Sequence, residues 1–411
     1  MKITPKRYIA TSVLTPHQIL LRGLIWVNLW FHILVSSVQA SPELRGLWVV
    51  RYTLTTPQKV YQMLESAEKN NFNAIFVQVY ARGEAFYPSR FVPLSRLVKR
   101  GFDPLALIVK EAHHRGLEVH TWLNIYYAWS FEDLPRDTTH LLNLYPWSSL
   151  VDESGRPLKD YTSKEFARHG LEGTFVSPAD LWIREYLLEI VREIVLKYDV
   201  DGIHLDYIRY PGLKYGYDVS SRSEFMRQFY VDPYDFLERP GELTFQLGRD
   251  GYLDLWTKWE RWKVDRVTEF VKNVRQELSR MNPWVKLSAA VIPDYQSAYS
   301  YHGQDWGRWL QEGLVDFVVP MCYDTQINTV IRQIRNGLAW VNKGDLIAGI
   351  AVYNQSVGEA IEKISAVRHL GVKGVVLFSY DAIADKPEYF QRLRHSVFWQ
   401  KVGMPDIACN Q

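Results

Sequence analysis

Eight short runs of β-branched and aromatic residues, separated by longer segments with helical periodicity, constrain the fold of this chain more than any other feature. Runs of this kind predict strands, and strands that alternate with helices predict parallel pairing, because parallel strands need a long crossover connection. The predicted strands span residues 46–50, 74–80, 118–124, 202–207, 286–292, 317–322, 346–352 and 375–379.

The segments between the strands complete the fold prediction. Helical periodicity predicts helices over residues 56–70, 104–114, 181–198 and 256–281. Eight strands with helical crossovers predict an α/β fold of the (β/α)8 TIM-barrel class. A doubly wound open sheet is the alternative, but no glycine-rich phosphate loop follows the first strand.

Two connections are long, and they follow the third and the fourth predicted strand, at residues 126–180 and 211–254. Neither carries a strong hydrophobic periodicity of its own. We therefore expect both to be insertions on one face of the barrel rather than separate domains.

The N-terminal forty residues have the pattern of a targeting segment. Four basic side chains precede an apolar run at residues 23–38, and the small residue Ala40 follows it. The run is shorter than the roughly 20 residues that span a bilayer, so it predicts a secretory signal peptide, with an uncleaved anchor as the alternative. We expect export to the periplasm or the medium, a barrel at 41–400, a tail at 401–411, and membrane contact through the leader only.

The composition narrows the classes of partner. A formal net charge of +2, with no basic run interleaved with aromatic residues, argues against a nucleic-acid partner. Two cysteines, Cys322 and Cys409, are too few for a disulfide framework or a structural zinc site. No motif for a cofactor or for a metal of defined ligand spacing occurs, so we expect neither.

Polar side chains follow every predicted strand, which matters because the active site of a parallel barrel lies where the strands end. Aromatic residues make up 14% of the chain, and amphipathic rings among these side chains suit a ligand with both apolar faces and hydroxyl groups. The candidate substrate-binding residues are Arg51, Gln78, Tyr80, Asn124, Tyr126, His204, Arg209, Tyr323, Tyr353 and Tyr380.

The fourth predicted strand carries the most informative candidates. Alternation along a strand directs His204 and Asp206 to the same face, which in a barrel is the interior. A carboxylate there is partly desolvated unless a cation pairs with it. Arg209 faces away in a regular strand, so such a pairing requires the chain to turn after Tyr207, as the nearby Pro211 makes plausible.

A second carboxylate, Asp324, follows the sixth predicted strand. Two carboxyl groups across one pocket suit glycosidic bond cleavage, in which one protonates the leaving oxygen and the other attacks or stabilises the anomeric centre. A separation of about 5 Å predicts retention of configuration and roughly 6.5–9.5 Å predicts inversion. A helix N-cap is the alternative role for Asp324. Glu84, after the second strand, is a further candidate acid.

Several segments together resemble the bacterial glycosyl-hydrolase-like 10 family. They are residues 43–49, 76–84 and 102–105 and the segment Asp201-Gly-Ile-His-Leu-Asp-Tyr-Ile-Arg-Tyr-Pro211, and the likeness extends from about residue 43 to 390. The resemblance implies a (β/α)8 barrel, an exported enzyme and a polysaccharide substrate. For the enterobacterial members the implied substrate is peptidoglycan glycan stripped of its peptides.

A more distant resemblance implies roles for the two aspartates. The segment Met321-Cys-Tyr-Asp324 is similar to one in family-18 chitinases, although Ile208 stands where their catalytic glutamate lies. In α-galactosidase-like barrels a nucleophilic aspartate ends strand four and an acid/base aspartate ends strand six. This pattern implies Asp206 as nucleophile or charge-stabilising carboxylate and Asp324 as general acid/base. The alternatives are a non-catalytic carbohydrate-binding barrel and a metal-dependent polysaccharide deacetylase or esterase. The candidate ligands of a metal site are His204, Asp206 and a residue of a neighbouring strand.

Overall fold

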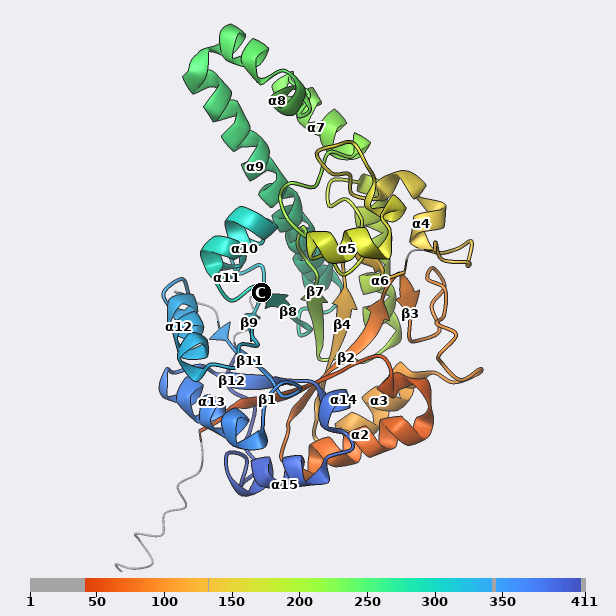
Figure 1. Ribbon diagram of the computed structural model, residues 1–411. Helices are drawn as coiled ribbons and strands as arrows, with labels where there is room; N and C mark the ends of the chain where they lie inside the picture. Colours follow the sequence, from red (N-terminus) through yellow and green to blue (C-terminus); the bar gives the residue numbers. More distant parts are fainter. Residues whose placement is uncertain (1–40, 132, 342–344, 408–411) are drawn as a thin grey trace, which may run out of the picture. The chain divides into compact units, whose positions relative to one another are not determined.

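The computed structural model describes residues 41–131, 133–341 and 345–407 (Figure 1). The predicted leader at residues 1–40 lies outside the described residues, as does the end of the predicted tail with Cys409. In the described part of the chain, no helix combines the length and the apolar character that crossing a bilayer requires.

Eight parallel strands close into a barrel, which confirms the predicted fold class. Each strand pairs in parallel with its neighbours, and β1 pairs with both β2 and β12, so the sheet has no open edge. The barrel strands are β1 (Leu44–Val49), β2 (Ala74–Ala81), β4 (Glu118–Asn124), β7 (Gly202–Asp206), β8 (Lys286–Val291), β9 (Phe317–Cys322), β11 (Ala348–Ala351) and β12 (Gly374–Phe378). A short β10 (Asp345–Leu346) precedes β11 and pairs with β9.

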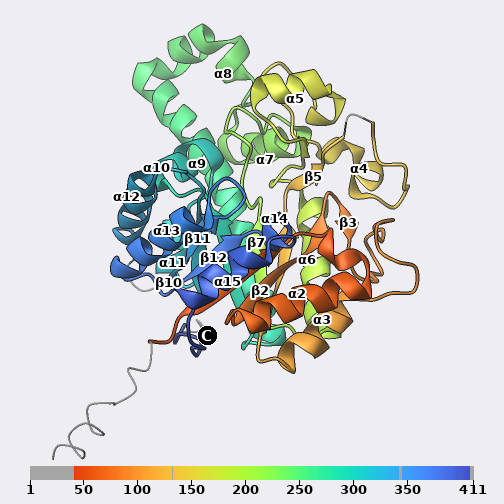
Figure 2. The ribbon, with the colours of Figure 1, turned by 60° about the horizontal axis from the view of Figure 1, so that its bottom comes forward.

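A helix or helix pair follows each barrel strand and covers the outside of the sheet (Figures 1 and 2). Several begin at a side-chain cap, such as Thr56 before α2 and Asp103 before α3, each followed by a proline at the first helical position. The helices are α2 (Pro57–Lys69), α3 (Pro104–His113), α6 (Leu181–Lys197), α9 (Pro240–Met281), α10 (Tyr295–His302), α11 (Trp306–Gln311), α12 (Ile327–Leu338), α13 (Val357–His369), α14 (Tyr380–Ile383) and α15 (Pro387–His395).

Side chains alternate between the barrel interior and the helix layer. In β2, Phe76 belongs to the interior apolar cluster, whereas Ile75 and Val77 belong to the larger cluster beneath the helices. The register between β2 and β4 shifts between Gln78 and Tyr80. This irregularity leaves Gln78 on the interior side and puts Tyr80 into the outer cluster.

The two long connections are insertions at the end of the barrel toward which the strand arrowheads point (Figure 1). The first contains β5 (Tyr127–Trp129), α4 (Leu141–Leu144), 3-10 turns at Pro146–Ser148 and Leu158–Asp160, α5 (Ser163–His169) and β6 (Thr174–Phe175), which pairs with β5. The hairpin β3 (Glu84–Ala85) extends β2 at the same end.

The second insertion differs from the expectation of a segment without helical pattern. It contains α7 (Val219–Phe229) and α8 (Asp235–Glu238), and α9 starts at Pro240 rather than near residue 256, with a break at Gly248, where φ is 69°. The helices are held by a separate aromatic cluster that includes Phe225, Phe236 and Trp259. Because each short helix contributes only one or two of these rings, its periodicity is weak in the sequence.

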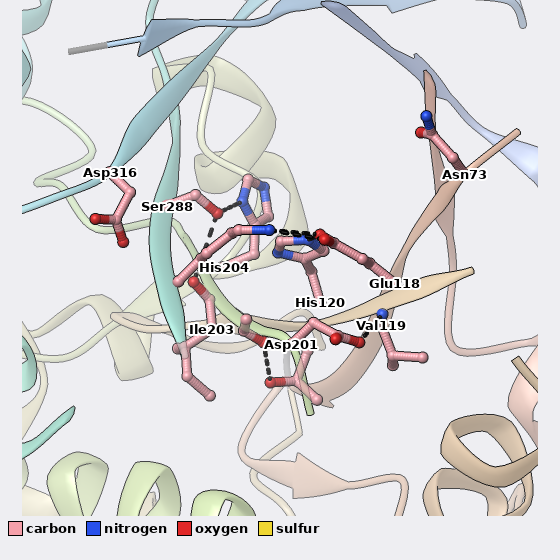
Figure 3. Close-up of polar contacts among 12 residues, drawn as sticks. Asn73, Glu118, Val119, His120, Asp201, Ile203, His204, Ser288 and Asp316 are labelled. Carbon is pink, nitrogen blue, oxygen red and sulfur yellow. Dashed lines mark hydrogen bonds and ion pairs between the residues drawn. The ribbon is translucent and has the colours of Figure 1, made fainter. Parts of the chain in front are cut away.

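A group of polar side chains, which includes Glu118, His120, His204 and Ser288, lies inside the barrel among apolar residues such as Phe76 and Phe317 (Figure 3). The Glu118 carboxylate accepts hydrogen bonds from Lys286 Nζ at 2.7 Å and 2.9 Å and lies 3.2 Å from His120 Nε2. Gly202 makes room for this ring, since a Cβ there would lie 2.1 Å from His120 Nδ1. Burial alone raises the pKa of Glu118, but His120 and Lys286 outweigh it and lower that pKa to about 2.

Glu118→Gln is expected to destabilise the fold by about 2 kcal/mol near pH 7, because Lys286 loses its anionic partner. A carboxyl whose pKa is lower in the folded chain stabilises the fold above its unfolded pKa, and this contribution is lost as the pH falls toward 2. Urea unfolding of wild type and variant near pH 7 and near pH 3 measures the effect. The difference should be clearly smaller at the lower pH, and an equal difference at both would contradict the assignment.

Candidate active site

A pocket of about 610 Å³ lies at the carboxyl ends of the barrel strands. All eight barrel strands contribute to its wall, either themselves or through a residue one or two positions after they end, and the first insertion adds Tyr127 and Glu172. The lining residues are Trp48, Val50, Arg51, Gln78, Trp122, Asn124, Tyr127, Glu172, Asp206, Tyr207, Arg209, Ala290, Ile292, Pro293, Met321, Tyr323, Tyr353 and Phe378.

Asp206 ends β7 and is the buried carboxylate of this pocket, with 6% of its surface exposed. Its Oδ2 accepts a hydrogen bond from Trp122 Nε1 at 3.0 Å, and its Oδ1 accepts one from its neighbour's backbone N–H at 2.7 Å. Burial raises the pKa of Asp206, and Arg209 and these two donors oppose that rise. The carboxylate is therefore poorly solvated but held in one orientation.

The chain turns sharply after β7, as the pairing of Asp206 with Arg209 requires. Tyr207 has a φ of 50°, a left-handed conformation that residues other than glycine rarely adopt. This turn brings Arg209 Nη1 within 3.6 Å of Asp206 Oδ1 and lays the guanidinium over the Tyr207 ring at 4.5 Å. Such conformations concentrate at functional sites, where the surrounding structure holds them in place.

Glu172 supplies the second carboxylate of the pocket. It lies in the first insertion, directly before Gly173 and β6, and its side chain is exposed. The Tyr207 hydroxyl donates a hydrogen bond to this carboxylate, and the Tyr127 hydroxyl donates to the Glu172 carbonyl at 2.9 Å. Since the Tyr207 backbone N–H binds Asp206, one tyrosine connects the two acidic groups.

A hydrogen-bonded polar wall adjoins these carboxylates. Arg51 Nη1 donates to Gln78 Oε1 at 3.0 Å, and Gln78 Nε2 donates to Asn124 Oδ1 at 3.3 Å. On the opposite strands, the rings of Tyr323 and Phe378 stack at 5.2 Å. The pocket therefore combines fixed polar groups with aromatic faces around two acids, an arrangement suited to acid/base chemistry on a polyhydroxylated ligand.

Residues 43–367 match the model of the family described as Glycosyl hydrolase-like 10. The chain belongs to this family. The glycosyl hydrolase YngK of Bacillus subtilis (strain 168) is 25% identical over 326 residues, covering 70% of this chain and 56% of that protein. The glycosyl hydrolase DigH of Escherichia coli (strain K12) is 22% identical over 331 residues, covering 70% and 67%. This member of the family thus spans little more than half the length of YngK.

Solved structures place the same fold among glycoside hydrolases. The glycoside hydrolase domain of PgaB (BpsB) from Bordetella bronchiseptica superposes with a TM-score of 0.63 at 14% identity, covering 86% of this chain and 98% of that chain. The α-L-fucosidase isoenzyme 2 of Paenibacillus thiaminolyticus gives 0.58 at 14% identity, covering 85% and 48%. At these identities the likeness establishes the fold.

The pocket of this glycosyl hydrolase-like 10 protein contains part of the predicted site. The predicted residues that line it are Arg51, Gln78, Asn124, Asp206, Arg209, Tyr323 and Tyr353. The predicted residues outside its lining are Tyr80, Glu84, Tyr126, His204, Asp324 and Tyr380. Three of the latter are tyrosines packed in the apolar cluster between barrel and helices, and burial raises the pKa of each. Glu84 borders another pocket, where it lies 3.6 Å from Arg82.

His204 lies below the pocket floor and is fully buried. Its Nε2 accepts from Trp48 Nε1 at 3.2 Å, so the proton of the neutral ring is on Nδ1, which lies 2.9 Å from Ser288 Oγ (Figure 3). Burial lowers the pKa of His204, which keeps this ring neutral. Because Trp48 lines the pocket, His204 positions a pocket wall and makes no direct contact with the cavity.

Asp324 is exposed, and its Oδ1 accepts a hydrogen bond from the Gln326 backbone N–H at 2.7 Å. Alternation explains this placement: Met321 and Tyr323 line the pocket, so the next side chain points away from it. The pocket lining therefore contains Asp206 but not Asp324, and Glu172 is the other carboxylate in it.

Within the described ranges, no group of three or more histidine, cysteine, aspartate or glutamate side chains is arranged to hold a metal ion. Cys322 is buried in β9, where burial raises the pKa of its thiol. The titratable groups that line the pocket are thus two carboxylates, two arginines and four tyrosines.

Proposed function

We propose that this chain is an exported glycoside hydrolase that cleaves glycosidic bonds in a bacterial cell-wall or related polysaccharide, with Asp206 and Glu172 as its two carboxyl groups. One observation carries the proposal: both acids line a single pocket at the catalytic end of the barrel, and Tyr207 hydrogen-bonds to both. Membership of a glycosyl hydrolase-like family supports a glycan substrate.

Asp206 acts on the anomeric carbon. It is buried, and N–H donors bind both of its oxygens, so the carboxylate is already oriented before the substrate arrives. A positive charge that develops on the sugar ring during bond cleavage is stabilised by such a carboxylate, either through space or by covalent attack.

Glu172 acts as the general acid and base. Its side chain is exposed, and the Tyr207 hydroxyl orients it. It gives its proton to the glycosidic oxygen as the carbon–oxygen bond breaks. A water molecule then attacks the anomeric centre and returns a proton to Glu172, which completes the hydrolysis.

The substrate class follows from the pocket walls and the sequence pattern. Arg51, Gln78 and Asn124 offer donors and acceptors for hydroxyl or acetamido groups, and Tyr323 and Tyr353 offer ring faces. The leader-like pattern of residues 1–40 supports export. Peptidoglycan glycan strands stripped of their peptides are the substrate implied by the resemblance described above, and we propose them here.

Incubation with peptide-free glycan strands tests the function. The expected result is the appearance of new reducing ends, measured against time and enzyme concentration. Retention on the strands without product would instead identify a carbohydrate-binding barrel. Release of acetate that a chelator blocks would identify a metal-dependent deacetylase and overturn the proposal.

Arg209→Gln is expected to move the acidic limb of the pH profile for glycan cleavage to higher pH. The Arg209 cation lowers the pKa of Asp206, so its removal raises the pH below which Asp206 becomes protonated and inactive. The measurement is kcat/KM for glycan strands across pH 4 to 8. An acidic limb at unchanged or lower pH would contradict the pairing, whatever the loss in maximal rate.

A further inference from the structure

A second pocket, of about 320 Å³, lies beside the first at the same end of the barrel. It is formed by the loop after β3 and by the first insertion, and it includes Trp129, Phe131 and Leu94 together with charged side chains of both signs at its rim. Figure 2 shows β5, which carries Trp129, at the end of the barrel where α4 and α5 also lie. Neither the carboxylates nor the polar wall described above belongs to this pocket.

Strand β5 connects the two pockets. Tyr127 lines the Asp206 pocket and Trp129 lines the second one, and the two residues are separated by at most roughly 7 Å of chain. Arg82 lies close to residues of both pockets. Its guanidinium is 5.9 Å from the Trp129 ring and 5.1 Å from the Phe131 ring of the second pocket. Burial lowers the pKa of Arg51, in the Asp206 pocket, and the charge of Arg82 lowers it further.

The two rings form a fixed aromatic surface. Trp129 Nε1 donates to the Asp133 carbonyl at 2.7 Å, and the Trp129 and Phe131 rings meet edge to face at 5.3 Å. Phe131 nevertheless leaves 55% of its surface exposed. An aromatic ring that is fixed in position but exposed to solvent can stack against the apolar face of a sugar. Polar groups beside the ring can then form hydrogen bonds with the sugar hydroxyls.

We propose that the Trp129–Phe131 pocket is a second glycan subsite, continuous along β5 with the Asp206 pocket, so that the substrate is a chain of several sugars bound in both pockets at once. This inference rests on the proposed function for the assignment of a sugar to the Asp206 pocket. It adds that the protein recognises a chain beyond the sugars at the scissile bond, and that affinity rises with chain length.

Binding measurements on the full chain test the subsite without relying on cleavage. Peptide-free glycan fragments of one and of four disaccharide units are titrated calorimetrically into Asp206→Asn protein, and the ratio of the two Kd values gives the gain in affinity with length. Phe131→Ala in this background is expected to reduce that gain about tenfold, because the stacking surface is lost. Phe131→Tyr keeps the ring and should keep the gain.

Phe245→Ala is the matched control, because Phe245 is 90% exposed on α9 and lines neither pocket. It should preserve the parental length dependence. The inference is overturned if Phe131→Ala leaves the Kd ratio within twofold of the parent, if Phe245→Ala lowers it equally, or if no fragment binds. Failure of the hydrolase proposal has a different signature: length-dependent binding that needs Phe131, with no new reducing ends from wild-type protein.

Discussion

Asp206→Asn is expected to lower the rate of glycan cleavage by about a thousandfold or more while the protein still folds and binds glycan. Asparagine has nearly the same shape but no charge, so the positive charge that develops on the sugar loses its buried, oriented counter-charge. The measurement is kcat/KM for new reducing ends on peptide-free strands, with binding of the same strands as a separate readout.

The stability of this variant distinguishes loss of chemistry from loss of fold. Burial raises the pKa of Asp206, and a carboxyl whose pKa is higher in the folded chain destabilises the fold as pH rises through that range. The melting temperature of Asp206→Asn at pH 7 should therefore equal or exceed that of wild type. The variant is therefore expected to lose activity but not stability, which is the usual relation between the two at a functional site.

Asp324→Asn is the matched control for this experiment. Asp324 also follows a barrel strand, but its carboxylate is exposed and bound to the Gln326 backbone N–H. We expect cleavage within about twofold of wild type, as for surface substitutions away from a site. A loss in Asp324→Asn as large as that in Asp206→Asn would restore Asp324 as the acid and refute the assignment to Glu172.

The barrel could be predicted from the sequence because its signal is local and repeated. Each strand is a short apolar run before a helical segment, as in β9 followed by α12, and eight such units are compatible with few other folds. The interruption at Ile347 between β10 and β11 and the long start of α9 could not be predicted. These features depend on pairing with β9 and on packing of Trp259 against distant rings, which the local pattern does not encode.

The alternation of side chains along a strand predicts pocket residues correctly only where the strand is regular. Alternation directs Asp206 inward, and the structure places it in the pocket. Tyr80 is predicted from its position at the end of the second strand, and Asp324 from its position after the sixth strand together with the resemblance to chitinases and α-galactosidase-like barrels. Tyr80 lies beyond a register shift in β2, and Asp324 follows an inward-facing tyrosine, so both side chains point away from the pocket.

Glu172 could not be identified from local sequence. It lies in an insertion, 34 positions before Asp206, and belongs to no predicted strand end. It reaches the pocket because β6 pairs with β5 and folds the insertion back over the barrel, where Tyr127 and Tyr207 bind its backbone and side chain. Glu172 is identified by the pairing of β5 with β6, two strands far apart in the sequence, and only the three-dimensional structure shows this pairing.

Glu172→Gln is expected to lower cleavage of glycan strands by about a hundredfold or more, because the glycosidic oxygen then leaves without a proton. The loss should depend on the leaving group. An aryl glycoside that releases dinitrophenolate needs no protonation, so its kcat/KM, which reports the steps up to departure of the leaving group and not the later attack of water, should fall far less than that of the strands. Asp206→Asn, by contrast, should impair both substrates, because the charge at the anomeric carbon develops in either reaction.

Glu153→Gln provides the control, since Glu153 is an exposed glutamate of the same insertion and borders a different pocket. It should leave both rates unchanged. An equal loss on both substrates in Glu172→Gln would show that Glu172 positions the sugar or stabilises charge and does not deliver the proton. Undiminished cleavage of strands would remove Glu172 from the mechanism altogether, and a pocket with one essential carboxylate would then require the substrate or water to supply the acid.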